Sequence, residues 1–242
     1  NVVGPPNQPW VGRAAFAHKG GIHVSAVQRN SATYEHVEPE LVGNTRRILV
    51  SELSGRSNIQ ATLAKTHPGL TDDALVKAVL DEVVAKENDG YSYEAADASF
   101  DLLVRRHVDA WTPAFELIHY RIHNLGADAG GGLVEATVKV RVAGQVRLCV
   151  AEGHGPVDAL AQALYEALAP HHPRLSDLKL MDYKVRVVNS SDGTAAKVRV
   201  LIEFQRDHRS FGTVGVSENI IEASWRALAE GIEYAVLTEA KA

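Results

Sequence analysis

The sequence predicts an α+β protein in which a mainly helical region is followed by two similar βββα units. Two observations carry this prediction. Hydrophobic residues recur with a helical period in the first part of the chain, and from Phe115 onward they alternate as in strands. The strand-rich pattern then occurs twice, with a repeat of roughly 60 residues. We therefore expect two regions, residues 1–110 and residues 111–242.

The N-terminal segment is expected to be an extended linker. Three prolines and one glycine occur in residues 1–10 without a regular period, and these residue types interrupt both helices and strands. The following stretch, residues 14–27, is mildly apolar and contains two adjacent glycines. Because the chain opens with Asn1 and has its only methionine at Met181, we expect it to be a fragment of a longer protein.

Three helices are expected before residue 110. The clearest covers residues 68–87, where Leu75, Val79 and Val83 recur at helical spacing. Thr71 is a candidate N-cap, since a threonine hydroxyl can accept a hydrogen bond from a free N–H of the first turn. The other two helices are expected at residues 57–65 and 93–104.

In two segments, apolar and polar residues alternate as in strands that have one buried and one solvent-exposed face. In residues 133–142, valines and an alanine alternate with charged or hydroxyl side chains, and residues 195–204 repeat the pattern apart from an apolar Leu201. Each unit leaves an apolar sheet face that one helix covers only in part, so we expect the units to pack together and then to form a homodimer. The first repeat is expected at about 115–168, with strands 115–123, 133–142 and 145–151 and a helix at 156–168. The second repeat is expected at about 178–236, with strands 180–188, 195–204 and 210–216 and a helix at 218–235.

Composition excludes several classes of protein. The net charge of −5 comes without a basic block, which argues against nucleic acid as a partner. No apolar run approaches the roughly 20 residues that cross a bilayer, and no signal-type segment opens the chain, so a cytoplasmic protein without a membrane partner is expected. Cys149 is the only cysteine, which excludes an intrachain disulfide, and its strand-like neighbours predict a buried, inert thiol.

The two junctions between third strand and helix carry capping residues at matching places. Two glycines precede Pro156 at the expected first helical position, and capping residues follow Val216 in the second unit. Free backbone N–H groups at a helix start can hold a small carboxylate. Ordinary capping is the alternative, although two helix starts related by the repeat can frame a ligand site. The candidate ligand residues are Gly153, Gly155, Asp158, Ser217, Glu218 and Asn219.

Three segments of the first region carry a specific resemblance: AFAHKGGIHVSA at residues 15–26, TYEHVEPELVG at 33–43 and LSGRSNI at 53–59. They resemble the linker subdomains of the isopropylmalate, citramalate and homocitrate synthase family, in which F-x-H-x-x-G-x-H surrounds a histidine and a tyrosine precedes an [IV]-[DE]-P turn. The repeat resembles the allosteric dimerisation domain of the same family, so the likeness extends over the whole chain. Val24, Ser25 and Arg56 are closer to the citramalate synthase branch than to the 2-isopropylmalate synthase branch.

The resemblance implies a chemistry that this chain does not perform alone. Family members remove a methyl proton from acetyl-CoA, add the enolate to a 2-oxo acid held on a divalent metal, and hydrolyse the thioester. The metal and acetyl-CoA are expected in an N-terminal (β/α)₈ barrel whose motifs are absent here, so no metal site and no cofactor are expected in this chain, which alone should be inactive.

Two residues of the linker match the positions that the family lends to its barrel, often in the neighbouring subunit. These are His23, the motif histidine, and Tyr34, the tyrosine before the turn. An imidazole can exchange a proton near neutral pH and a phenol can donate to a thioester oxygen, which makes them a candidate acid/base pair. The alternative is that both only fix the linker in place. His18 is expected to be structural or to orient a neighbour.

The sequence is compatible with three functions. The first is the regulatory and linker half of a citramalate synthase, joining acetyl-CoA to pyruvate for isoleucine biosynthesis and inhibited by isoleucine. The second is the same half of a 2-isopropylmalate synthase, with 2-oxoisovalerate as substrate and leucine as inhibitor. The third is a stand-alone amino-acid sensor. The expected partners are a second copy, a branched-chain amino acid and, for the enzymes, the barrel of the same protein.

Overall fold

The chain forms two compact units, Asn1–Glu94 and Ala95–Ala242. The computed structural model describes residues 5, 7–12, 14–19, 21–48, 56–67, 69–70, 72–108, 111–125, 133–189, 193, 195–207 and 209–239. Its helices and strands make the α+β architecture that the sequence predicts. The first unit is mainly helical, and both sheets of three strands belong to the second.

The first unit is built on three helices. Helix α1 packs on α2, and α2 packs on α3. Their buried residues are Val24 and Val27 of α1, Ile59 and Leu63 of α2, and Val76, Val79 and Val83 of α3. A short parallel pair, β1 with β2, joins the segment before α1 to the segment before α2. The elements are β1 (Ala17–His18), α1 (Gly21–Arg29), η1 (Ser31–Thr33), η2 (Pro39–Val42), β2 (Arg47–Ile48), α2 (Arg56–Thr66) and α3 (Asp73–Asn88).

Helix α3 begins later than its pattern suggests. Its N-cap is Asp72, whose carboxylate accepts a hydrogen bond from the Leu75 N–H at 3.2 Å. The candidate cap Thr71 lies outside the described residues. The predicted helix is confirmed, and Val79 and Val83 are fully buried, but Val76 is buried in place of Leu75, which is half-buried.

The second unit contains the two predicted βββα repeats. One antiparallel sheet has the order β3-β4-β5 and is followed by α5; the other has the order β6-β7-β8 and is followed by α6. A further helix, α4 (Asp97–Arg106), precedes them and packs on β8 and α6. The repeat elements are β3 (Glu116–Leu125), β4 (Leu133–Val142), β5 (Gln145–Gly153), α5 (Pro156–Leu168), η3 (Pro173–Asp177), β6 (Lys179–Val187), β7 (Val198–Arg206), β8 (Arg209–Ser217) and α6 (Ile220–Glu239).

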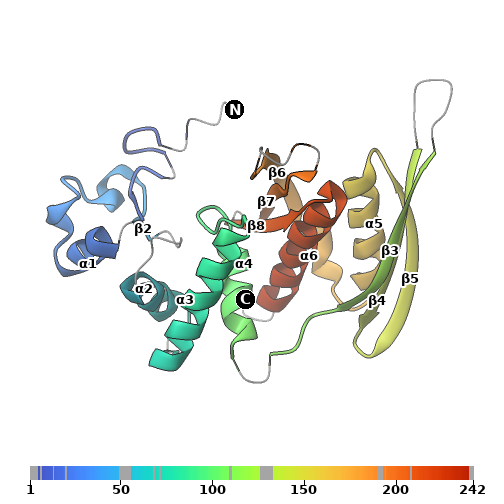
Figure 1. The fold of residues 1–242 in the computed structure, drawn as a ribbon, viewed down its shortest axis with the longest axis horizontal. Coiled ribbons are helices and arrows are strands. Elements are labelled where there is room, and N and C mark those ends of the chain that lie inside the picture. The colour runs from blue at the N-terminus through green and yellow to red at the C-terminus, as the bar shows by residue number, and fades with distance from the viewer. Residues whose placement is uncertain are drawn as a thin grey trace. The chain divides into compact units, whose positions relative to one another are not determined.

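One hydrophobic core joins the two repeats. Helix α5 packs on β4 and β5, α6 packs on β7 and β8, and the two helices pack on each other, so that α5 lies between the sheet β3–β5 and α6 (Figure 1). The inward residues of β4 are buried in strict alternation, from Val134 to Val142. Each fully buried valine or leucine contributes about 1.5–3 kcal/mol relative to an exposed one. The amphipathic strands and helices therefore account for this arrangement.

The hairpins of the two repeats have the same register. Val142 pairs with Gln145 across a two-residue turn, and Arg206 pairs with Arg209 in the same way. Ala143 and Gly144 both have positive φ, at 49° and 77°, which a turn of this kind requires. Within the described ranges, no helix is both long and apolar enough to cross a membrane.

Two candidate functional sites

The first candidate site is a contact between His23 and Tyr34. His23 lies on α1 and Tyr34 directly follows η1; their rings stack with centroids 4.2 Å apart and an interplanar angle of 25°. Both side chains are exposed, Tyr34 at 47%. The fold thus brings together the two residues that the family resemblance singled out and leaves both rings accessible to another molecule.

A tight turn after α1 produces this contact. Asn30 caps η1, with its side-chain oxygen accepting from the Ala32 N–H at 3.1 Å. The Thr33 hydroxyl donates to the Asn30 carbonyl at 2.8 Å. These local bonds reverse the chain, so that Tyr34 returns to the face of α1 that carries His23.

A buried carboxylate fixes the residue next to Tyr34. Glu35 is 7% exposed, and the Arg46 Nε donates to both of its oxygens at 2.9 Å while Nη2 contacts one of them. His18 Nε2 lies 2.8 Å from the same carboxylate. The Arg46 hydrogen bond lowers the pKa of Glu35, with His18 adding to the effect and burial opposing it. The carboxylate therefore stays ionised and ties three segments together.

Sequence reasoning missed this cluster. Arg46 and Glu35 stand in loops without a hydrophobic period, and nothing in their spacing predicts that they meet. The only available signal was an acidic residue directly after the motif tyrosine.

The second candidate site comprises the starts of α5 and α6, which lie at the same end of the second unit (Figure 1). At the start of α5, Asp158 accepts a hydrogen bond from the His154 N–H at 2.9 Å and lies 3.4 Å from the Gln162 amide nitrogen. Gly153 allows β5 to approach the helix closely, because a Cβ there would lie 2.4 Å from the Ala159 nitrogen. Gly155 is the N-cap residue, ahead of Pro156.

The start of α6 is capped by side chains. Ser217 accepts from the Asn219 N–H at 3.1 Å and is 3.0 Å from the Glu222 carboxylate. Asn219 in turn accepts from the Ile221 N–H at 2.9 Å, and Glu218 is exposed. Asn219 thus caps α6, whereas Asp158 and Ser217 accept from backbone N–H groups just before the two helices. A role for the six residues in holding a ligand stays a prediction.

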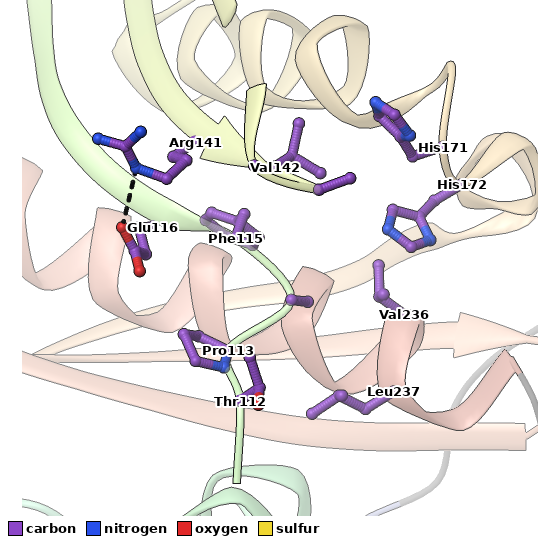
Figure 2. Close-up of a pocket in the computed structure, with 13 residues that line it drawn as sticks. Thr112, Pro113, Phe115, Glu116, Arg141, Val142, His171, His172, Val236 and Leu237 are labelled. Atoms are coloured by element: carbon purple, nitrogen blue, oxygen red, sulfur yellow. Dashed lines mark hydrogen bonds and ion pairs between the residues drawn. The ribbon is translucent and has the colours of Figure 1, made fainter. Parts of the chain in front are cut away.

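A pocket of about 500 Å³ lies at the opposite ends of these helices, where α5 and α6 finish (Figure 2). Glu116 and Arg141 form an ion pair of 3.3 Å on one side of it, and His171 and His172 line the other. None of the six candidate ligand residues lines this pocket. Its lining consists of residues 112–116, residues 141–144, His171, His172, Val236 and Leu237.

A metal site is not formed by the part of the chain that the structure describes. No group of three or more His, Cys, Asp or Glu side chains is close enough there to hold an ion. Cys149 is buried, as predicted, and burial raises the pKa of its thiol.

Comparison with known protein families defines the class to which this fold belongs. The LeuA allosteric (dimerisation) domain matches residues 94–236, and the homocitrate synthase post-HMGL domain-like family matches residues 10–90. The chain therefore belongs to the LeuA allosteric (dimerisation) domain family, and its first unit is similar to the homocitrate synthase post-HMGL domain.

Individual relatives are more specific. An (R)-citramalate synthase of Geobacter sulfurreducens is 47% identical over 97% of this chain and 45% of its own length. Those of Aquifex aeolicus and Streptomyces coelicolor are 46% and 42% identical, over 99% and 98% of this chain and 46% and 45% of their own lengths. The chain thus spans less than half the length of the curated relatives that it matches.

Proposed function

We propose that this chain is the linker and feedback-regulatory region of an (R)-citramalate synthase, which condenses acetyl-CoA with pyruvate in isoleucine biosynthesis. The observation that carries the proposal is that relatives with this one name match both units, over 97% to 99% of the chain. The residues Val24, Ser25 and Arg56 favour the same branch over 2-isopropylmalate synthase.

The first unit has the task of completing an active site on a barrel. His23 can exchange a proton and Tyr34 can donate one, and both rings are exposed and stacked at 4.2 Å, which suits presentation to another body. The divalent metal and acetyl-CoA belong to the barrel in this scheme. By itself the chain is expected to be inactive; release of CoA from acetyl-CoA and pyruvate by the purified chain would contradict this.

The second unit has the task of binding a branched aliphatic amino acid, with isoleucine favoured, and of holding a homodimer together. The helix N-termini suit the ligand carboxylate, and Asp158 or Glu218 can meet its ammonium group. Asp158 is held at the start of α5, since one of its oxygens accepts from the His154 N–H at 2.9 Å. Strands and helices of the core can enclose the aliphatic side chain.

Calorimetry with isoleucine, leucine and valine tests the regulatory task. One displaced methyl group offers about 1–3 kcal/mol of discrimination, so we expect isoleucine to bind about 10- to 100-fold more tightly than leucine. Tighter binding of leucine would reassign the chain to the 2-isopropylmalate synthase branch. If none of the three binds at millimolar concentration, the regulatory assignment is wrong.

A pair of variants locates the site. The double variant Asp158→Asn, Glu218→Gln keeps side chains that can cap the helices but removes the charges that meet the ammonium group, so isoleucine binding should weaken at least tenfold. Asp177→Asn, at the end of η3, removes an exposed carboxylate elsewhere in the unit and should bind normally. Equal affinities of the two variants would place the ligand somewhere else.

A further inference from the structure

The last strand of the first sheet carries an exposed apolar row. Val146, Leu148 and Val150 of β5 are 49%, 59% and 50% exposed, and they share the face that Thr137, Lys139 and Arg141 occupy on β4. Strand β5 ends the order β3-β4-β5, so one of its sides has no neighbouring strand among those of the described residues. We call Val146, Leu148 and Val150, together with their backbone groups, the β5 edge.

The backbone of the β5 edge points outward. Val142 and Gln145 flank the two-residue turn and form a hydrogen-bonded pair, after which bonded and non-bonded pairs alternate along an antiparallel ladder. The N–H and C=O groups of Val146, Leu148 and Val150 are therefore directed away from β4. No residue in the described part of the chain hydrogen-bonds to them.

The matching strand of the second repeat is closed. By the shared hairpin register, Gly212 and Val214 of β8 correspond to Leu148 and Val150. The Gly212 N–H donates to Asp97 at 2.8 Å and the Val214 N–H to Ser99 at 2.9 Å, both on α4. Arg226 donates to the Val216 carbonyl at 2.6 Å. One chain therefore protects one of two equivalent edges and leaves the other open.

Charge distinguishes the outer row of β5 from the outer row of β6, the first edge strand of the second repeat. On β6, the row that faces away from the core consists of Asp182, Lys184 and Arg186, which pair with Glu203, Leu201 and Arg199 of β7; Val187, 57% exposed, lies on its other face. Charged side chains on an edge strand oppose pairing with another chain. The β5 edge has no charged residue in its outward row, which suits it to pairing.

We propose that β5 pairs antiparallel with β5 of a second copy of this chain, joining two three-stranded sheets into one continuous sheet. The inference rests on the homodimer in the proposed function. A two-fold axis at Leu148 sets Val146 opposite the second copy's Val150, so that apolar side chains meet along the whole outward row. No like charges face each other in this register.

The same register also bears on a buried guanidinium on the other face of the strand. The Nε atom of Arg147 is buried without a hydrogen-bond acceptor in the part of the chain described. Within one chain both Arg147 and Glu166 act on the Cys149 thiol, and across the two-fold axis Arg147 lies opposite the second copy's Cys149. Pairing therefore sets the buried guanidinium of each copy beside the thiol of the other.

Sedimentation of the wild-type chain and three variants tests the proposal. The wild-type chain should be a dimer at micromolar concentration. Leu148→Lys should be a monomer, because it places two like charges opposite each other at the axis, and Val150→Lys should behave in the same way. Val187→Lys, the same kind of change at an equally exposed residue of β6, should remain a dimer. Circular dichroism verifies that each variant is folded.

The outcomes separate this proposal from the function on which it rests. A wild-type monomer contradicts both the homodimer and the β5 pairing. If the wild type is a dimer and both Leu148→Lys and Val150→Lys remain dimers, the β5 pairing is wrong but the homodimer stands. The same conclusion follows if Val187→Lys is also a monomer. Isoleucine binding, measured separately by calorimetry, decides the regulatory function whatever the state of association.

Discussion

Tyr34 and His23 meet because of a tight turn, and neither ring is buried. The turn is held by Asn30 and Thr33 within a few residues of the contact. Such a pair is held in position by the chain while both rings stay open to a partner. This arrangement differs from a packing contact, in which burial of the rings would supply the stabilisation.

In the citramalate synthase that we propose, Tyr34→Phe should lower kcat by about 10²- to 10⁴-fold, the usual range for acid/base assistance. The change preserves the ring that stacks on His23 and removes only the hydroxyl, so KM for the oxo acid should change much less. His23→Ala should have the same effect on kcat. His36→Ala, an exposed neighbour, is the control. Wild-type turnover in both Tyr34→Phe and His23→Ala would mean that the linker is only a spacer.

Glu35 makes the first unit sensitive to acid. Its pKa in the folded state is below the usual value of 4.5, mainly because of Arg46. The stabilisation from this carboxylate is therefore fully present above that usual value and is lost as the pH falls through the lowered pKa.

Glu35→Gln should lower the free energy of unfolding by roughly 1.5–3 kcal/mol at neutral pH, the range for hydrogen bonds to charged groups. It should also flatten the loss of stability below the usual carboxyl pKa. Urea unfolding at a series of pH values measures both effects, and Glu40→Gln, an exposed carboxylate in η2, is the control. An unchanged acid profile in Glu35→Gln would show that another group governs it.

At the scale of the elements, helix α6 contains a glycine that its own propensity disfavours. Gly231 lies in the helix interior, where glycine costs roughly 0.5–1 kcal/mol relative to alanine. The reason lies on β7, because a Cβ on Gly231 would come within 2.0 Å of the Phe204 ring. Phe204 is fully buried and stacks on Phe211 at 5.6 Å, so it has little room to move.

Gly231→Ala should therefore lower the free energy of unfolding by about 1–3 kcal/mol, as overpacking of a core does. Helix propensity alone predicts that alanine would raise it. Thermal or urea unfolding measures the change. The double variant Gly231→Ala, Phe204→Leu should recover part of the loss, since the smaller side chain leaves space for the methyl group. A Gly231→Ala protein more stable than the wild type would contradict the close approach.

At the scale of the whole molecule, helix α4 is part of the second compact unit, which begins at Ala95. Its Asp97 and Ser99 close the β8 edge, and its Phe100, Leu102 and Leu103 are buried. Sequence reasoning placed the division near residue 110, at the change from helical to strand-like period. The spacing of hydrophobic residues predicts whether an element is a helix or a strand, whereas tertiary packing decides to which unit the element belongs.

A fragment of residues 95–239 should unfold in one cooperative transition. A fragment of residues 111–239 lacks α4, leaves the buried N–H of Val214 without its acceptor and exposes the apolar surface beneath the helix. Each unsatisfied buried group costs about 1–3 kcal/mol, so the shorter fragment should be less stable or should aggregate. Differential scanning calorimetry compares the two fragments, and equal stability would support the predicted division near residue 110.

The sequence by itself determined the two βββα repeats, the helix start at Pro156 and the buried state of Cys149, because each depends on local period or residue type. Its motifs also determined the family and picked out His23 and Tyr34. Only the tertiary structure decided that Arg46 and His18 converge on Glu35, that α4 closes β8, and that the equivalent edge on β5 stays open. A hydrophobic period states which face of an element is buried, but the element that covers it is chosen by long-range packing, and residues in irregular loops carry no period at all.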